Sequence, residues 1–195
     1  MPAPAQPDLE TDRVYRTRQL APWGKNPARL VQRLVAEGKL CELARGLYFA
    51  PRIGRFGVVP PDDDELLRAF LESEAFVVTG PPAWNTLGLG ATALFSAPLV
   101  YNRKRSGEFV LGGRKFVLRR VAFPDRPPRE WYAIDLVEHQ AMAGVAPDAL
   151  AAGLVRELQA GRLDAAVLGE MAARFGTRTT QDLVRRCVRR AQEAA

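Results

Sequence analysis

The sequence predicts an α+β fold, in which a small N-terminal unit of helices and strands precedes a mixed α/β domain with a β-hairpin and a C-terminal helical bundle. Three observations predict it. A capped amphipathic helix and two short strands lie before residue 58. Two apolar strands flank a Gly-Gly turn near residue 112. From residue 131 onward, helical stretches alternate with single glycines.

The N-terminal helix is predicted to begin after Asn26, whose side chain can cap it, with Pro27 at the first helical position and Gly38 at its end. Apolar residues recur at helical spacing along one face, and small or polar residues share the other. Small side chains allow a helix to approach a DNA groove, and arginine and glutamine hydrogen-bond base edges or phosphates. The apolar face comprises Leu30, Val31, Leu34 and Val35, and the second face comprises Ala28, Arg29, Gln32, Arg33 and Ala36.

A shorter helix is predicted before it. Residues 17–21 form a short capped helix, and residues 22–24 form the turn that joins the two helices. This is the layout of a helix-turn-helix, whose second helix enters the major groove of DNA. A complete winged-helix domain also requires a first helix, which has to fit within residues 7–15.

The segment after the longer helix is predicted to be a wing. Residues 39–44 and 47–50 form two short strands, with Arg45 at the bend between them. An arginine at a wing tip lies against the DNA backbone or in the minor groove. The alternative interpretation is an amphipathic helix packed on a hairpin, with its arginines merely solvated.

Pro60 and Pro61 mark a boundary between two predicted domains, residues 1–57 and residues 58–195. The acidic residues that follow the prolines favour the start of a helix. The net charge of the chain is +6, and it is segregated: residues 1–57 carry ten basic and five acidic side chains, whereas residues 58–100 carry one and six. Segregated charge is expected when particular surfaces face phosphate.

A second basic patch lies around the predicted hairpin of the second domain, whose strands are expected at residues 108–111 and 115–121. Its side chains could contact phosphates or an acidic or RNA-associated partner. A solvated loop is the alternative. The patch comprises Arg103, Lys104, Arg105, Lys115 and Arg119.

The sequence lacks motifs for catalysis, cofactors and metals. His139 is the only histidine, and although Asp135 lies four residues before it, no nearby serine or cysteine completes a triad. No complete nucleotide-binding glycine motif occurs, and the two cysteines indicate neither a disulfide framework nor a zinc cluster. No apolar run reaches the roughly 18 residues that span a bilayer, and the N-terminus has no signal core. We therefore expect a cytoplasmic, non-enzymatic protein without cofactor or metal.

The order of these features resembles the AbiEi-type antitoxins of type IV toxin-antitoxin (abortive infection) systems. The likeness covers most of the chain and is carried by four segments. These are the helix at residues 30–38, the Arg-Gly-Leu-Tyr wing at residues 45–48, the segment from Val78-Thr79-Gly80 to Leu87-Gly88-Leu89, and the hairpin at residues 109–121.

This resemblance implies a winged helix that binds inverted repeats in the protein's own promoter and represses transcription. It also implies a C-terminal domain that counteracts a nucleotidyltransferase-type toxin encoded beside it. A module that holds the toxin directly, with DNA binding incidental, is the alternative. The toxin's own Gly-Ser signature and paired aspartates are absent, so the chain resembles the antitoxin partner. The positions that match DNA contacts are Thr17, Arg18, Asn26, Arg29, Gln32, Arg33, Lys39 and Arg45.

Overall fold

A computed structural model describes residues 7–91 and 97–193, and its mixture of helices and sheets confirms the α+β class. Its backbone contacts group into two compact units. The first contains the residues up to 74 together with residues 109–115, and the second contains residues 75–108 and those from 116 onward. The first unit therefore extends beyond residue 57, the predicted end of the DNA-binding domain.

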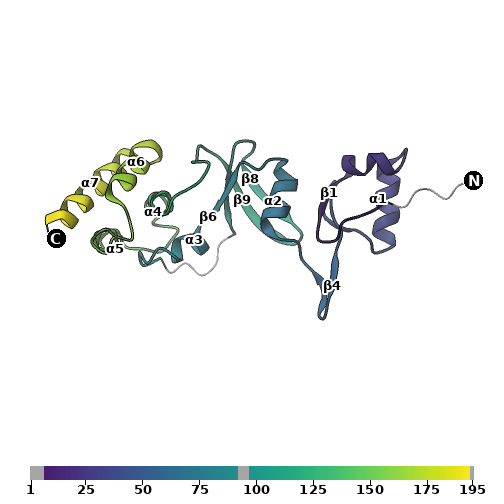
Figure 1. The fold of residues 1–195 in the computed structure, drawn as a ribbon, viewed down its shortest axis with the longest axis horizontal. Coiled ribbons are helices and arrows are strands. Elements are labelled where there is room, and N and C mark those ends of the chain that lie inside the picture. The colour runs from purple at the N-terminus through teal and green to yellow at the C-terminus, as the bar shows by residue number, and fades with distance from the viewer. Residues whose placement is uncertain (1–6, 92–96, 194–195) are drawn as a thin grey trace, which may run out of the picture. The chain divides into compact units, whose positions relative to one another are not determined.

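The first unit contains a three-stranded antiparallel sheet with the strands in the order β1 (Val14–Arg16), β3 (Leu47–Phe49) and β2 (Cys41–Ala44) (Figure 1). The 3-10 helix η1 (Thr17–Trp23) packs on helix α1 (Pro27–Ala36). The short helix, the longer helix and the ribbon thus follow one another in the predicted chain order. The short helix differs from the prediction in being 3-10 and in including the first two residues of the expected turn.

Helix α1, η1 and the sheet share one apolar core. Val35, predicted on the apolar face of α1, is instead 38% exposed. It follows Leu34 by one residue, and the resulting rotation of about 100° carries it to the margin of the buried stripe. The buried residues of this core are Tyr15, Leu20, Leu30, Val31, Leu34, Leu40 and Ala50.

Residues 7–15 contain no helix, so the first helix of a complete winged-helix domain is absent from them. The segment has too few apolar side chains for a helical stripe, and its end forms the buried strand β1. A later helix, α2 (Asp63–Leu71), packs against β1 instead. The Arg16 side chain ties the two together, because it donates hydrogen bonds to the carbonyl oxygens of Ala69 (2.9 Å) and Phe70 (2.5 Å).

A second hairpin, which was not predicted from the sequence, follows the three-stranded sheet. Strands β4 (Arg52–Gly54) and β5 (Gly57–Val59) pair only with each other, in antiparallel register. The hairpin projects from the body of the first unit (Figure 1). Arg55 and Phe56 form the two-residue turn at its tip. We call residues 52–59 the arm.

The four-stranded sheet has the order β6-β7-β9-β8, formed by β6 (Phe76–Thr79), β7 (Leu99–Asn102), β9 (Arg114–Arg120) and β8 (Gly107–Leu111). Strands β6 and β7 are antiparallel, and β7 and β9 are parallel. The predicted hairpin is confirmed as β8–β9. Its turn uses Gly112 and Gly113, both with positive φ, a conformation that favours glycine.

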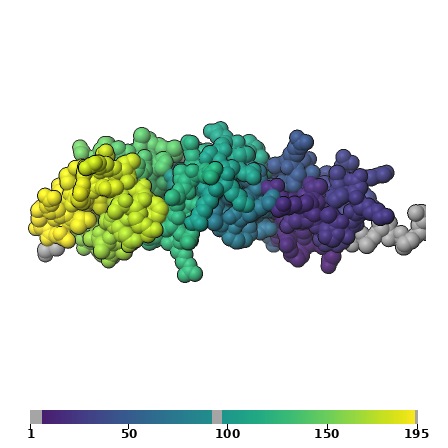
Figure 2. Space-filling view, turned by 90° about the horizontal axis from the view of Figure 1, so that it is seen from above, coloured from purple at the N-terminus to yellow at the C-terminus, as the bar shows by residue number. Residues whose placement is uncertain are grey.

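Helices dominate the rest of the second unit, and they confirm the predicted bundle. They are α3 (Pro81–Asn85), α4 (Arg129–Glu138), α5 (Pro147–Gln159), α6 (Ala165–Phe175) and α7 (Arg178–Glu193). Helix α5 packs on α7, and α4 packs on α6. Helices α6 and α7 also lie side by side (Figures 1 and 2). Helix α4 ends at Glu138, whereas the sequence predicts a helix over residues 131–143.

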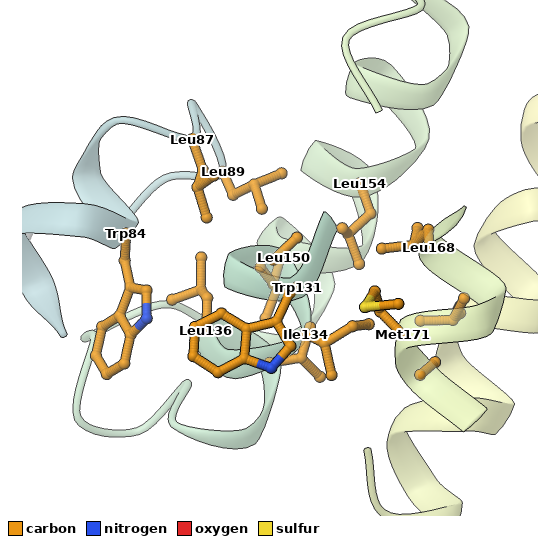
Figure 3. Close-up of a cluster of buried hydrophobic side chains, with 14 of the residues drawn as sticks. Trp84, Leu87, Leu89, Trp131, Ile134, Leu136, Leu150, Leu154, Leu168 and Met171 are labelled. Carbon is orange, nitrogen blue, oxygen red and sulfur yellow. The ribbon is translucent and has the colours of Figure 1, made fainter. Parts of the chain in front are cut away.

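The core of the second unit joins these helices to the sheet. Trp84 and Trp131 belong to one buried cluster with leucines of α4, α5 and α6 (Figure 3). Burial of such large apolar side chains is the main source of stability for a unit of this size. Within the described ranges, no helix is both long and apolar enough to cross a membrane.

Candidate nucleic-acid interface

Helix α1 begins and ends at the residues that its sequence predicts. The Asn26 Oδ1 atom accepts a hydrogen bond from the Arg29 backbone N–H (3.1 Å), and Pro27 occupies the first helical position. Gly38 follows the helix with a φ of +70°, and its N–H donates to the Val35 carbonyl oxygen (3.0 Å). These contacts satisfy backbone groups that helix ends otherwise leave without partners. They fix α1 as a short, rigid element.

One face of α1 is anchored, and the other faces solvent. Leu30, Val31 and Leu34 are no more than 6% exposed. The predicted polar residues Arg29 and Gln32 are exposed, as is Arg33. The small residues Ala28 and Ala36 are also exposed, so no bulky side chain shields the backbone of this face.

The charges of this face are partly neutralised at its C-terminal end. The Glu37 carboxylate lies 2.8 Å from Lys39 Nζ and 3.7 Å from Arg33 Nε. The hydrogen bond from Lys39 lowers the pKa of Glu37 below its ordinary value. Within residues 7–91 and 97–193, Arg29 has no acidic partner and the Gln32 side chain has no hydrogen-bond partner. Arg29 and Gln32 therefore remain available to an external ligand.

Two predicted contact residues on η1 have internal partners. The Thr17 N–H donates to the Gly46 carbonyl oxygen (3.2 Å), which attaches the start of η1 to the turn of the ribbon. The Arg18 guanidinium pairs with the Glu72 carboxylate, just after α2. Arg16 pairs with the same carboxylate at 2.8 Å. Arg18 is thus exposed but already bound to an acid of its own chain, unlike Arg29.

The predicted wing is a short, tightly held turn. Strands β2 and β3 are joined by Arg45 and Gly46, and Gly46 has a φ of +77°. The Leu43 carbonyl oxygen accepts a hydrogen bond from the Gly112 N–H (2.8 Å), which further restrains the ribbon. The Arg45 side chain is exposed, and it has no acidic partner in the described part of the chain. In the described ranges, the ribbon therefore presents Arg45 as an unpaired cation, on a short turn that stays close to the sheet.

The arm carries exposed residues that the sequence analysis missed. Phe56 at its tip is 98% exposed, and the Arg55 guanidinium lies 5.8 Å from the centre of its ring. The signal was present in the sequence, because Gly54 and Gly57 flank a two-residue turn between apolar residues, a pattern typical of hairpins.

Three residues of the second basic patch lie in an ordered turn after β7. The buried Asn102 organises this turn, because its Oδ1 atom accepts hydrogen bonds from the backbone N–H groups of Lys104 and Arg105, both at 2.8 Å. Arg103 pairs with Asp125 at 2.8 Å. The backbone of this turn is therefore held by Asn102.

The other two residues of the patch lie elsewhere in the fold. Arg119 is on β9, in register with Tyr101 of β7. Lys115 belongs to the first unit, whereas the other four residues belong to the second.

The second unit also contains a buried polar cluster. Asp135 on α4 accepts hydrogen bonds from Thr79 Oγ1 (2.5 Å), Trp84 Nε1 (2.8 Å) and the Tyr101 hydroxyl (2.6 Å). His139, one turn later, places its Nδ1 atom 2.9 Å from the Asp135 carbonyl oxygen and 3.4 Å from carboxylate Oδ1. The sequence showed the Asp135–His139 spacing but not the three donors, which come from β6, α3 and β7.

Hydrogen bonds keep the Asp135 carboxylate charged in spite of its burial. Burial disfavours the charged form of Asp135, but the hydrogen bonds from His139, Thr79, Tyr101 and Trp84 outweigh it and lower the pKa of Asp135. The hydrogen bond to Asp135 raises the pKa of His139 in spite of its burial.

A cavity of about 300 Å³ lies beside the cluster. Among the residues that the structure describes, neither a serine nor a cysteine lines it. The cluster ties α4 to the sheet. The side chains described here include no group of three or more histidines, cysteines or acids that could hold a metal ion.

A scan of the sequence against known protein families finds no match, and a search among curated proteins finds no similar one.

Proposed function

We propose that this chain binds double-stranded DNA in a sequence-specific way through the exposed face of α1. The observation that carries the proposal is that one capped helix presents both Arg29 and Gln32, which are exposed and have no side-chain partner among residues 7–91 and 97–193. Arginine pairs with guanine and glutamine with adenine through two hydrogen bonds each in the major groove. The alanines beside them let the helix backbone approach the base edges.

The surroundings of α1 support the same proposal. Strand order β1-β3-β2 places the ribbon that follows α1 in the same sheet as the strand that precedes η1. Arg45 on the ribbon and Arg33 on the helix supply cations for the DNA backbone. Phosphate contacts of this kind position a protein on the duplex, and base contacts then select the sequence.

Building on the resemblance to AbiEi-type antitoxins, we further propose a biological role. The chain is a cytoplasmic, non-enzymatic antitoxin of a type IV toxin-antitoxin pair, which represses its own promoter and counteracts a nucleotidyltransferase-type toxin encoded beside it. The order of helix, ribbon, hairpin and helical bundle supports this role, and the basic turn at residues 103–105 offers a surface for the toxin or its target.

The DNA-binding proposal is tested by titrating a labelled fragment of the protein's own upstream DNA with the full chain. We expect an Arg29→Ala/Arg33→Ala variant to bind at least tenfold more weakly, because each arginine contact contributes about 1–3 kcal/mol. An Arg185→Ala/Arg189→Ala variant on α7 removes the same charge and is the matched control. Equal binding by wild type and the α1 variant would refute the proposal.

The antitoxin role is tested by co-expressing the neighbouring gene with the full chain or with the α1 variant. We expect both to relieve growth arrest, because the resemblance assigns neutralisation to the C-terminal domain (residues 58–195), which the substitutions do not touch, while only the wild type represses the promoter. Co-purification of the two gene products would show that neutralisation acts by direct contact. A neighbouring gene that does not arrest growth would contradict the role.

A further inference from the structure

The arm forms a two-stranded sheet of its own, whereas the β2–β3 ribbon belongs to the three-stranded sheet. The ribbon is held at its turn by the Thr17 N–H, which donates to Gly46, and on β2 by the Gly112 N–H, which donates to Leu43. Strands β4 and β5 instead form a sheet of their own, and the turn between them projects from the first unit (Figure 1). Ile53 and Val58 form a cross-strand pair, 70% and 52% exposed respectively. A hairpin that exposes apolar side chains in this way indicates a binding surface.

The shape of the tip limits what it can enter. Gly54 and Gly57 are the cross-strand pair next to the turn, so the two positions that flank the tip carry no side chain. Only Arg55 and Phe56 extend beyond them. The tip is therefore a narrow wedge made of one cation and one aromatic ring. The minor groove of DNA is only about 6 Å wide, and a hairpin tip flanked by glycines is narrow enough to enter it.

The chemistry of the arm favours a polyanion over an apolar protein surface. Residues 50–61 include arginines at positions 52 and 55 and contain no acid. Arg52 pairs with Asp12 at the base of the arm (3.0 Å), which leaves Arg55 as the cation at the tip. Apart from Arg52, which pairs with Asp12, the strands carry isoleucine, valine and glycine, whose side chains cannot hydrogen-bond base edges as a ribbon in the major groove does.

We propose that the arm inserts its tip into the minor groove beside the site bound by α1, with Phe56 wedged between two base pairs and Arg55 against the groove walls. This inference rests on the proposed DNA binding. Apolar wedges that enter the minor groove unstack a base step and kink the duplex by about 20–90°. The narrow groove has a strong negative potential that attracts an inserted arginine. The arm thus makes the protein a DNA-bending regulator.

The test measures both affinity and bending on the upstream DNA, with donor and acceptor dyes at the ends of the fragment. We expect the wild type to shorten the end-to-end distance. Phe56→Ala abolishes the bend and lowers affinity by roughly fivefold or more, the range of a lost stacking contact. Arg55→Ala lowers affinity and reduces its dependence on salt. Val110→Ala removes an exposed apolar side chain on β8, outside the arm, and is the matched control that keeps the wild-type bend.

The outcomes separate this inference from the proposed function. Failure of the wild type to bind the upstream DNA would overturn both. Binding that depends on Arg29 and Arg33 but is identical in affinity and bend for Phe56→Ala would overturn the role of the arm alone. A change of oligomeric state in Phe56→Ala, measured by sedimentation without DNA, would show that a second copy covers the tip and would also overturn it. Because Phe56 is almost fully exposed, its removal leaves the fold intact.

Discussion

The exposed face of α1 and the cluster around Asp135 use polar side chains in opposite ways. Asp135 is buried, and its carboxylate accepts hydrogen bonds from three other elements of the second unit. Arg29 and Gln32 are exposed, and no partner within residues 7–91 and 97–193 engages their side chains. A buried polar group costs free energy unless it is satisfied internally, so the first arrangement stabilises the fold. The second leaves hydrogen-bonding capacity for a ligand.

This difference identifies which charged residues are candidates for function. Arg18 and Arg29 were both predicted to contact DNA, and both are exposed. The guanidinium of Arg18 pairs with Glu72, so it has to break an ion pair before it can bind phosphate. Arg29 has no such competitor within the described ranges.

Asp135→Ala is expected to have the largest effect, and on stability alone. The substitution leaves the donors of Thr79, Trp84 and Tyr101 buried without an acceptor, at about 1–3 kcal/mol each. We expect the free energy of unfolding of the second unit to fall by about 3 kcal/mol or more in urea titrations. Asp148→Ala, at an exposed position on α5, is the control. Unchanged stability of Asp135→Ala would show that the hydrogen bonds of Asp135 do not stabilise the packing of α4 on the sheet.

His139→Gln is expected to change how stability depends on pH. The folded state raises the pKa of His139, so the imidazolium stabilises the fold fully below the unfolded pKa of about 6.5. That contribution is lost as pH rises through the folded pKa. The wild type should therefore lose stability from acidic to mildly alkaline pH, and the variant should lose less. Parallel pH profiles would contradict the pairing of His139 with Asp135.

Glu37→Gln is expected to have the smallest effect, and on DNA affinity. It removes the acid that pairs with Lys39 and Arg33, and exposed pairs of this kind contribute at most about 1 kcal/mol. We expect a gain in affinity of up to about fivefold at low salt, with a smaller gain at high salt. Glu42→Gln, an exposed acid on β2, serves for comparison. Weaker binding by Glu37→Gln would show that the DNA does not contact the exposed face of α1.

Local signals predicted most elements of the fold. The cap at Asn26, the glycine after α1 and the Gly112-Gly113 turn each act through neighbouring backbone, so their sequences are sufficient. Residues 7–15 and the arm were not predicted. The first depends on a strand partner 35 residues away, since Val14 pairs with Phe49. The second is a hairpin with no sheet to pack on, so it lacks the alternation of buried and exposed residues that marks most strands.

The candidate site was predictable only in part, for a similar reason. Helical periodicity alone places Arg29 and Gln32 opposite the leucines of α1. It cannot show that Arg18 meets Glu72, because the two are 54 residues apart. The donors to Asp135 lie 34 to 56 residues away and were equally hidden. Long-range partners decide which polar residues are already satisfied.

The central claim is that the exposed face of α1 reads base edges. The most direct test determines the base preference at every position of the bound DNA for wild type and for Gln32→Ala. A glutamine that pairs with adenine should, when removed, abolish the preference at one position and leave the others intact. Identical preferences at every position in the two proteins would show that Gln32 does not touch a base and would contradict the account.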